Sequence, residues 1–321
     1  MIKFSVLIPN YGYNQYLIEC INSLVFQEKN STFQYEIIVC DQSDYEIYEK
    51  IKKQILAVSK DVIIFHKEEK SLYKARCDLI NKASGDYIVF VDSDDFVMKD
   101  FLATLSYKIT ILDFPDIFIQ NLCLCDEDGK ALNRFIDIPD ETNNLSYKDY
   151  YFYSNILNSV VRKIFKRNLY QNIINENIIN GEDWATSLSI VKYAKKIIVD
   201  NSFKKYFYRQ LSNSMSRNFD INIACQALFF KDQYLPPISN LNQKKLYVEQ
   251  KLYDYVSYIR KLVQIKSLKY WKFRQISIKL RNNIYKQFKL KGRIDTSLLY
   301  KIILNLLKIR LYFFIFVLFK F

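Results

Sequence analysis

Short apolar runs alternate with amphipathic stretches along about the first hundred residues. The apolar runs have the length of strands buried on both faces of a sheet, and the stretches between them repeat apolar side chains every three or four positions, as helices do. The predicted strands are 4–8, 35–40, 61–65 and 87–91, and the predicted helices are 16–27, 46–58 and 71–83. Because strands that alternate with helices form βαβ units, the pattern predicts an α/β fold, a mostly parallel, Rossmann-like sheet with flanking helices.

The pattern is less regular in the rest of the chain. The elements it predicts are strands at 116–121 and 196–200, a turn at 126–129 and a helix at 183–194, with loops and short elements between 130 and 180. From about residue 242 the apolar spacing is helical, and lysines and aromatic residues are interleaved along it. The sequence therefore predicts an α/β unit followed by a basic α-helical C-terminal region.

The composition describes a globular chain of 321 residues, of which 50% are apolar and 25% are charged. The single histidine, His66, excludes metal sites built from several histidines. The six cysteines form no Cys-X-X-Cys pair and mostly lie in apolar runs, so we expect buried thiols in a reducing compartment. Residues 1–9 lack the long apolar core of a secretory signal and lead directly into a predicted strand, so we expect a cytoplasmic protein.

The formal net charge of +13 is concentrated near the C-terminus. Residues 244–321 contain 19 Lys and Arg against three acidic residues, a net charge of +16. Residues 1–243 contain 28 basic and 31 acidic residues, a net charge of −3. A strongly basic tail on a mildly acidic body predicts an anionic partner for the tail, either a membrane surface or a nucleic acid.

Three of the predicted strands end at residues that suit ligand binding. Pro9, Asp41 and Asp92 stand at these ends, and parallel sheets bind ligands at the carboxyl ends of their strands. Asp92 opens the sequence Asp-Ser-Asp-Asp, which ends at Asp95. Neighbouring buried carboxylates are costly unless a cation neutralises them, and Mg²⁺ or Mn²⁺ commonly bridges carboxylates to a diphosphate. The cluster therefore predicts a metal–diphosphate site; the alternative is a solvated acidic turn that caps the next helix.

The order of motifs in residues 4–95 resembles the donor half of family 2 glycosyltransferases of the GT-A fold. The matching segments are Ser-Val-Leu-Ile-Pro-Asn-Tyr at 5–11, Glu-Ile-Ile-Val-Cys-Asp at 36–41, Lys-Ala-Arg at 74–76, Asn-Lys-Ala-Ser-Gly-Asp-Tyr at 81–87 and Asp-Ser-Asp-Asp at 92–95. More thinly spread matches follow, namely Lys-Ile-Phe-Lys-Arg at 163–167, Gly-Glu-Asp-Trp at 181–184 and Tyr-Arg-Gln at 208–210 with the serines at 212, 214 and 216. The resemblance implies an inverting bacterial enzyme that uses a nucleotide sugar.

The resemblance also implies roles for residues in the donor half. Asp94 would bind a divalent metal, Mn²⁺ or Mg²⁺, and Asp92 would face the ribose or the metal shell. Asp41 would accept a hydrogen bond from the uracil N–H of a UDP sugar, and Arg76 would lie near the base or the diphosphate. The remaining members of the predicted donor-binding set are Pro9, Tyr11 and Ser93. The residues alone leave two alternatives open, Asp41 as an ordinary turn residue and Arg76 as a helix-surface arginine.

The Gly-Glu-Asp-Trp segment implies roles in the acceptor half. Asp183 is the predicted general base, and a base on the face opposite the leaving group predicts inversion. From the residues alone, the better explanation of Asp183 is an acidic residue favoured at a helix N-terminus by the helix dipole, and only the resemblance reverses this preference. Trp184 is predicted either to stack on a sugar or to lie in the core or at its rim. Further residues predicted near the acceptor or the diphosphate are Glu182, Arg209 and Ser214.

Three positions depart from the family's pattern. Gly12 stands where an asparagine is common, with Asn14 nearby, and Gln42 replaces a frequent second aspartate. Leu211 lies where some members carry a histidine suited to a metal. Because His66 is far away in the sequence, at the end of the third predicted strand, we expect the metal to have a single protein ligand, Asp94, together with the diphosphate.

The predicted organisation has two parts, a GT-A domain at 1–217, with a donor half at 1–121 and an acceptor half at 122–217, and a helical, aromatic-rich region at 218–321. Residues 297–321 are apolar with embedded cations, but the longest uncharged run at their end is nine residues, too short to span a bilayer. We expect 297–321 to lie on an anionic surface, the inner face of the cell membrane. The alternative is a helical region that packs its aromatic side on the body.

The sequence thus predicts a metal-dependent inverting hexosyltransferase that acts on a glycan or lipid-linked acceptor, in the synthesis of a surface polysaccharide, lipopolysaccharide or capsule. Two further classes stay open: a nucleotide-sugar-binding protein without catalysis, and a nucleic-acid-binding protein with a basic tail. The second leaves the acidic motifs of the body unexplained, so we expect no nucleic-acid partner. A nucleotidyltransferase is a weaker alternative, because the chain lacks a glycine-rich phosphate loop.

Overall fold

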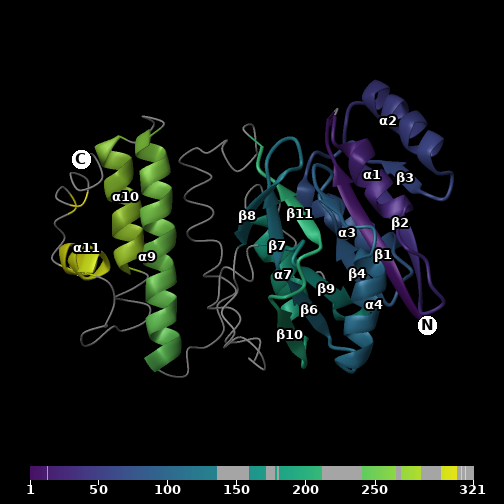
Figure 1. Ribbon diagram of the computed structural model, residues 1–321. Coiled ribbons are helices and arrows are strands. Elements are labelled where there is room, and N and C mark those ends of the chain that lie inside the picture. The colour runs from purple at the N-terminus through teal and green to yellow at the C-terminus, as the bar shows by residue number, and fades with distance from the viewer. Residues whose placement is uncertain are drawn as a thin grey trace. The chain divides into compact units, whose positions relative to one another are not determined.

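The computed structural model describes residues 1–12, 14–135, 159–170, 178, 181–211, 241–264, 269–282, 298–308, 312 and 315. The described residues up to 211 form one compact unit, and those from 241 onward form another (Figure 1). The domain boundary predicted at 217/218 falls outside the described residues, so it stays a prediction.

A seven-stranded sheet forms the centre of the first unit, in the order β10-β6-β9-β4-β1-β2-β3 (Figure 1). Its strands are β1 (Ile2–Asn10), β2 (Phe33–Asp41), β3 (Ile63–His66), β4 (Tyr87–Phe90), β6 (Ile117–Gln120), β9 (Lys163–Lys166) and β10 (Ile197–Asp200). Neighbouring strands are parallel except around β9, which is antiparallel to both β4 and β6. The prediction of a mostly parallel sheet is confirmed.

Strand β1 lies between β2 and β4 and explains the apolar run that predicted it. Phe4, Val6, Leu7 and Ile8 are all fully buried, as a strand covered on both faces requires. Ser5 is the polar residue of the run, and its hydroxyl accepts a hydrogen bond from the backbone N–H of Gly85 (2.8 Å). A Cβ at Gly85 would lie 2.7 Å from the backbone nitrogen of Ser5, so the close approach of the two segments requires glycine.

The sequence pattern does not predict strand β9, because lysines stand at both ends of its two-residue apolar centre. In the structure both lysines have partners. The Lys163 ammonium donates to the carbonyl of Ser159 (2.5 Å), and the Lys166 ammonium pairs with Asp116 (3.0 Å). These contacts satisfy the charges of a segment that lies inside the sheet, and they join residues whose proximity the pattern does not reveal.

The helices of the first unit are α1 (Leu17–Val25), α2 (Tyr45–Val58), α3 (Leu72–Lys82), α4 (Phe101–Ile111) and α7 (Glu182–Val191), with a short 3₁₀ helix, η2 (Arg167–Leu169), after β9. Helix α3 packs on β1 and β2 and begins at Ser71, whose hydroxyl accepts from the backbone N–H of Lys74 (3.4 Å). The sequence pattern does not predict α4, because its apolar residues are spread around the helix and give little periodicity. Helix α7 packs against α3, which brings the predicted acceptor half next to the predicted donor half.

A smaller sheet completes the first unit, in the order β5-β11-β7-β8. Its strands are β5 (Phe96–Val97), β11 (Tyr206–Arg209), β7 (Leu122–Cys125) and β8 (Ala131–Phe135). Strand β4 belongs to the large sheet and β5 to the small one, so the acidic segment 92–95 links the two sheets. The segment is therefore fixed by a strand at each end.

The described part of the second unit is helical and consists of α9 (Leu241–Gln264), α10 (Tyr270–Arg281) and α11 (Leu298–Lys308). Helices α9 and α10 lie side by side (Figure 1), and the Tyr255 hydroxyl hydrogen-bonds the Ser277 hydroxyl across them (2.7 Å). The rings of Tyr255 and Phe273 lie 6.2 Å apart between their centroids. Within the described parts of the chain, no helix is both long enough and apolar enough to cross a membrane.

Candidate active site

The segment 92–95 forms a tight turn held by the small sheet. The backbone N–H of Asp95 donates to the carbonyl of Asp92 (3.0 Å) and closes the turn. From β11, the Tyr206 hydroxyl donates to the Asp95 carboxylate (2.6 Å) and accepts from the backbone N–H of Asp92 (3.0 Å). Asp95 is 1% exposed, whereas Asp92 and Asp94 are only partly buried. Asp95 therefore anchors the turn, and because β5 follows it directly, the helix-capping alternative is wrong.

Burial raises the pKa of all three carboxyl groups in this turn. For Asp92 the neighbouring carboxylates Asp183 and Asp94 add to the effect of burial, and Arg76 opposes it. A cation beside the turn would stabilise its charged form. Among the residues that the structure describes, however, no three Asp, Glu, His or Cys side chains are grouped to hold a metal by themselves. The residues therefore fit a divalent cation that takes one or two carboxylate oxygens from the protein and its other ligands from a diphosphate.

Arg76 on α3 joins this turn to the start of α7. Its side chain is 2% exposed and forms ion pairs with Asp183 (Nη1–Oδ1, 2.6 Å) and Asp92 (Nη2–Oδ1, 3.5 Å). Burial disfavours the charge of Arg76, but the carboxylates of Asp183, Asp92 and Glu182 outweigh it and raise the pKa of the guanidinium. The helix-surface alternative for Arg76 is therefore wrong. Two acidic residues that lie far apart in the sequence share one buried cation.

The first turn of α7 carries the acidic pair Glu182 and Asp183. The preceding residue, Gly181, has φ +97°, in the left-handed region that favours glycine, and the helix begins directly after it. The side chain of Asp183 is 30% exposed, so its carboxylate is held by Arg76 and still open to another molecule. Burial, with the nearby Asp183 charge, raises the pKa of Glu182. A carboxylate that is both oriented and accessible can accept a proton from a bound hydroxyl.

Trp184, the next residue of α7, is 1% exposed and lies in the core. Every residue of α7 from 184 to 191 is buried. Stacking of Trp184 on a sugar, one of the two predicted alternatives, is therefore wrong, because a ring that stacks must present a face to its ligand. The core alternative is confirmed.

Lys163, whose pKa is influenced by Asp183, and its neighbour Arg162 are buried basic residues that the predicted site does not include. Lys163 is fully buried and Arg162 is 2% exposed. Burial lowers the pKa of Lys163 to about 7; Asp183 opposes this shift, and Arg162 and Arg76 reinforce it. A lysine and an arginine inside the apolar run Val-Val-Arg-Lys-Ile-Phe at 160–165 are the signal that could have identified them.

Arg209 on β11 supports the acidic turn by another set of contacts. Its Nε donates to the carbonyl of Asp94 (2.9 Å), Nη1 to the carbonyl of Glu127 (2.6 Å) and Nη2 to the carboxylate of Glu19 (2.7 Å). Its backbone N–H donates to Asp95 (2.8 Å), and its guanidinium lies 4.3 Å from the centre of the Tyr16 ring. The side chain is 1% exposed. Arg209 is thus a support of the turn, and its contact with a diphosphate or an acceptor stays a prediction.

The carboxyl ends of β1 and β2 lie side by side, because the register pairs Asn10 with Asp41. The Asp41 carboxylate accepts from the Asn10 amide (2.6 Å) and from the backbone N–H of Ser43 (2.9 Å), and it is fully buried. Pro9 is buried in β1, whereas Tyr11 is 57% exposed. A nucleobase reaches Asp41 only if the side chains around it move.

The positions that depart from the family's pattern have structural roles in this chain. Gly12 has φ +73°, which favours glycine. The Asn14 amide donates to the hydroxyl of Ser93 (3.1 Å) and so contacts the acidic turn. The Gln42 amide donates to the carbonyl of Ser71 (3.1 Å) and ties the end of β2 to the start of α3.

His66 ends β3, as predicted, and its Nε2 lies 2.7 Å from the carbonyl of Ser43. This contact and the packing of its ring against Tyr48, 4.8 Å away between centroids, keep His66 out of the acidic turn. Leu211 has an aliphatic side chain, and a single protein ligand together with the diphosphate stays a prediction. Ser214 lies outside the described residues.

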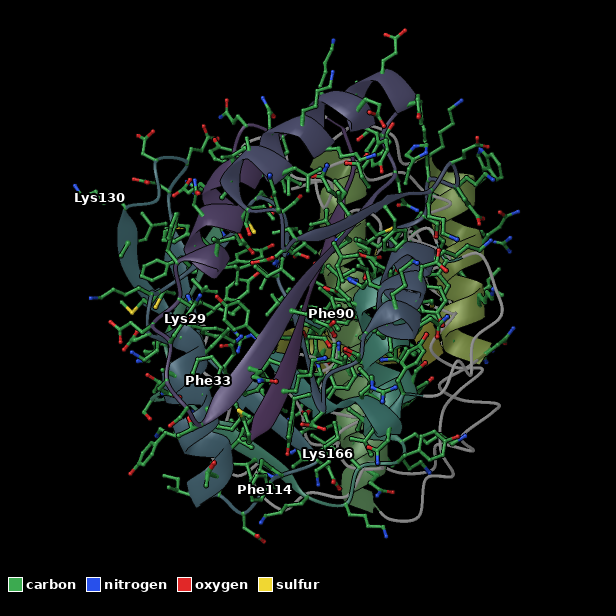
Figure 2. The ribbon with its side chains drawn as sticks, turned by 90° about the vertical axis from the view of Figure 1, so that its right-hand side faces the viewer. Lys29, Phe33, Phe90, Phe114, Lys130 and Lys166 are labelled. Carbon is green, nitrogen blue, oxygen red and sulfur yellow. The ribbon has the colours of Figure 1, made fainter. Side chains whose placement is uncertain are left out.

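A cavity of about 710 Å³ lies at the other end of the large sheet, near the start of β1 and β4. Its lining includes Met1, Tyr87, Phe114 and Lys166 and none of the candidate site residues. Figure 2 shows Phe114 and Lys166 near the lower end of the view, away from Phe90, whose ring lies 5.8 Å from the Arg76 guanidinium. The candidate site is thus defined by its charged side chains and not by this cavity.

Residues 5–173 match the family model for glycosyl transferase family 2. The chain is also similar to two glycosyltransferases of Streptococcus pneumoniae serotype 4, GlyA and GlyG. GlyA is 26% identical over 225 residues, which make up 67% of this chain and 32% of GlyA. GlyG is 28% identical over 232 residues, which make up 68% of this chain and 75% of GlyG. The match therefore spans about a third of GlyA and three quarters of GlyG.

A third relative is the poly(ribitol-phosphate) beta-N-acetylglucosaminyltransferase TarS of Staphylococcus aureus, 26% identical over 218 residues, or 65% of this chain and 35% of TarS. The crystal structure of TarS 1–349 in complex with UDP-GlcNAc matches with a TM-score of 0.63 at 17% identity, covering 96% of this chain and 92% of that one. This structural likeness shows a common fold, and the family model covers more than half of the chain. The chain therefore has the GT-A fold and belongs to glycosyl transferase family 2.

Proposed function

We propose that the enzyme moves a sugar from a UDP-linked donor to an acceptor hydroxyl and inverts the anomeric centre. The observation that carries this proposal is the double ion pair of Arg76 with Asp183 and Asp92. It joins a candidate general base to the turn that is proposed to hold the donor diphosphate. A single displacement needs a base and a leaving-group site close to one another.

Asp183 is proposed to act as the general base. Arg76 orients its carboxylate, which takes the proton of the acceptor hydroxyl while the oxygen attacks the anomeric carbon. Attack on the face opposite the departing diphosphate inverts the configuration. Glu182, in the same helical turn, is proposed to contact the acceptor.

Asp94 is proposed to bind Mg²⁺ or Mn²⁺ directly, with Asp92 facing the ribose or the metal shell. When bound, such an ion neutralises charge on the leaving diphosphate. The protein orients the carboxylates by its own contacts, since Arg209 binds the Asp94 carbonyl and Tyr206 accepts from the Asp92 backbone N–H.

The nucleotide is proposed to bind at the carboxyl ends of β1 and β2. Asp41 would accept the uracil N–H, with Pro9, Tyr11 and Ser93 around the nucleotide and Arg76 near the diphosphate. UDP as the nucleotide is supported by the TarS crystal structure, which contains UDP-GlcNAc. Ser214 is proposed to lie near the diphosphate.

A glycan or lipid-linked polymer of the bacterial cell surface is the proposed acceptor. TarS is named for poly(ribitol-phosphate), and another relative, TuaG of Bacillus subtilis, is named for teichuronic acid biosynthesis. Lipopolysaccharide or capsule synthesis is the corresponding destination proposed from the sequence. The family assignment favours catalysis over sugar-nucleotide binding alone.

The proposed location is peripheral, on the inner face of the cell membrane, through residues 297–321. The support is their composition, apolar with embedded cations. Deletion of 297–321 is expected to weaken binding to vesicles that contain phosphatidylglycerol. An unchanged affinity would contradict this location.

Release of UDP from a panel of UDP-sugars, with and without Mn²⁺, tests the proposed reaction. Asp183→Asn is expected to lower the rate by on the order of 100-fold or more, because the amide accepts no proton from the acceptor. Asp61→Asn, at an exposed position of the first unit, is the matched control and should behave like the wild type. If Asp183→Asn releases UDP as fast as the wild type does, Asp183 is not the base. If the wild type binds UDP-sugars but releases no UDP with any acceptor, the binding-only alternative holds.

A further inference from the structure

Helix α10 has an inner face that packs within the second unit. Phe273, Ile276 and Leu280 are at most 3% exposed, and Ser277 hydrogen-bonds Tyr255 of α9. Spacings of three and four residues place these side chains on one side of the helix. The inner face therefore accounts for the apolar period of α10.

The outer face of α10 is centred on Trp271, which is 52% exposed. With 100° of rotation per residue, Trp271 points away from the inner face, and Ile278, seven residues later, lies almost directly in line with it. Ile278 is partly exposed, so these two side chains form a short apolar ridge. An indole left in water at this position is unusual, because large aromatic side chains mostly lie inside.

Cations border this ridge on both sides. The same rotation places Arg274 on one side of Trp271 and Lys272 and Lys279 on the other. Arg274 and Lys279 are exposed, and the Lys272 ammonium lies 4.5 Å from the centre of the Trp271 ring. The exposed Lys269 precedes the helix. The ridge is thus apolar in its middle and positive at its edges.

Acidic residues are absent from α10, whose sequence from 270 to 281 contains none. In the described part of the second unit the acidic residues are Glu249 and Asp254, both on α9, and Asp254 is 5% exposed. The positive charge of the outer face is therefore not balanced on its own helix.

We infer that the outer face of α10 docks on an anionic lipid bilayer. Tryptophan is enriched at the level of the lipid headgroups, where its ring meets the acyl boundary and its N–H meets water. Lysine and arginine beside it are attracted to anionic headgroups. A single indole with an aliphatic neighbour suits this interface better than a row of aromatic rings, which is what stacking on nucleic-acid bases requires.

This inference concerns residues 269–279, not residues 297–321, and it does not depend on the catalytic proposal. A membrane that holds the enzyme through α10 would keep it near a lipid-linked acceptor, but bilayer binding does not require the reaction to be the one proposed. If the wild-type protein binds the vesicles but releases no UDP from any UDP-sugar, the proposed reaction is wrong and the inference about α10 is unaffected.

The chain contains two tryptophans, which makes the contact directly observable. Trp184 is 1% exposed in the core of the first unit, and Trp271 is 52% exposed on α10. With full-length protein and vesicles of phosphatidylglycerol and phosphatidylcholine, we expect the emission to shift to the blue and to be quenched by brominated lipids. Trp271→Phe should abolish both changes, because the remaining tryptophan is already buried. Contact through 297–321 alone would leave the emission of Trp271 unchanged.

A charge-removal variant tests the cations. The triple change Lys272→Gln, Arg274→Gln and Lys279→Gln is expected to weaken binding to these vesicles by on the order of 100-fold at low salt. The matched control is Lys50→Gln, Lys53→Gln and Lys60→Gln, which removes the same charge from exposed positions of the first unit. The control should bind within about threefold of the wild type if the attraction is local, since charges beyond a Debye length contribute little.

Four results would overturn the inference. These are unchanged emission of Trp271 on vesicles that bind the protein, equal loss of binding in the two triple variants, equal binding to vesicles of phosphatidylcholine alone, and tighter binding to a single-stranded oligonucleotide than to the anionic vesicles. The last result would assign the face to nucleic acid. A urea unfolding midpoint equal to that of the wild type shows that the α10 triple variant is folded.

Discussion

Arg76 on α3 and Arg209 on β11 are both buried, and both contact the acidic turn at 92–95, but they bind different kinds of group. Arg76 pairs with carboxylates, those of Asp92 and Asp183. Arg209 binds mostly main-chain carbonyls, those of Asp94 and Glu127, and one half-exposed carboxylate, that of Glu19. The Arg76 side of the turn thus needs a positive charge, and the Arg209 side needs a fixed set of hydrogen-bond donors.

The positive charge should therefore matter most at Arg76, and the arrangement of hydrogen-bond donors should matter most at Arg209. A carboxylate is stabilised by any nearby cation, whereas three oxygens in different directions need the planar fork of a guanidinium. Lysine should therefore replace Arg76 in part and Arg209 hardly at all. Lysine keeps the positive charge and glutamine removes it, so the two substitutions at each position measure how much the charge contributes.

The largest effect is expected at Arg76. Arg76→Gln leaves Asp92 and Asp183 without their shared cation, and loss of orientation at a reacting group can lower a rate by on the order of 100-fold. The folded state should lose about 2 kcal/mol, less than for a fully buried pair because both carboxylates are partly exposed. UDP release and urea unfolding measure the two effects.

Arg76→Lys is the matched variant on this side. It keeps one positive charge, so its rate should exceed that of Arg76→Gln by on the order of tenfold. If the two variants release UDP equally slowly, the rate does not depend on the charge of Arg76, and Arg76 and Arg209 do not differ in this respect.

At Arg209 we expect a smaller loss that charge does not rescue. Arg209→Gln and Arg209→Lys both lose the fork that binds Asp94, Glu127 and Glu19, which should cost about 2 kcal/mol of unfolding free energy and slow UDP release by on the order of tenfold. The Mn²⁺ concentration for half-maximal release should rise in both, because the backbone that carries Asp94 is less well fixed.

Recovery in Arg209→Lys comparable to that in Arg76→Lys would show that Arg209 also acts through its charge. Tyr107→Phe, at an exposed position of α4, serves as a control for general effects on folding.

The donor half of the fold could be predicted from the sequence because its strands are buried on both faces. The apolar run that predicted β1 lies within the observed strand, and the ends of β1, β2 and β4 bring Pro9, Asp41 and Asp92 to one edge of the sheet. Strand β9 could not be predicted, because its lysines are satisfied by Ser159 and Asp116, which neither spacing nor hydropathy identifies.

The candidate site, too, could be predicted only in part. The acidic residues of the turn are visible in the sequence, since local carboxylates form a motif. The buried cations Arg76, Arg162 and Lys163 are not recognisable as a group, because α3 and the region of β9 meet α7 only in the fold. Trp184 is ambiguous in the sequence, and only its burial decides between core and sugar contact.

Lys163, whose pKa is influenced by Asp183 and Arg76, should make the stability of the fold depend on pH. Burial lowers the pKa of Lys163 to about 7, with Asp183 opposing and Arg162 and Arg76 reinforcing the shift. Between this pKa and the unfolded value of about 10.4, the unfolded chain carries a proton on Lys163 that the folded chain lacks. The unfolding free energy should therefore rise with pH in this window, by at most about 1.4 kcal/mol per pH unit.

Lys163→Met should remove that slope, and urea titrations at a series of pH values measure it. The exposed Lys53→Met is the control and should keep the wild-type slope. A slope that survives in Lys163→Met would show that Lys163 stays protonated in the fold.

The smallest effect is expected at Glu19, the one carboxylate that Arg209 binds through its side chain. Its side chain is 49% exposed, so solvent screens the pair and its contribution should stay below about 1 kcal/mol. In Glu19→Gln the amide oxygen still accepts from Nη2, and the bonds to the carbonyls of Asp94 and Glu127 remain. Urea unfolding and UDP release should therefore stay close to wild type, in contrast to Asp183→Asn, which alters the carboxylate partner of Arg76. If Glu19→Gln lowers the unfolding free energy and the UDP-release rate as much as Arg209→Gln does, Arg209 acts mainly through an ion pair. Both arginines would then support the turn through their charge.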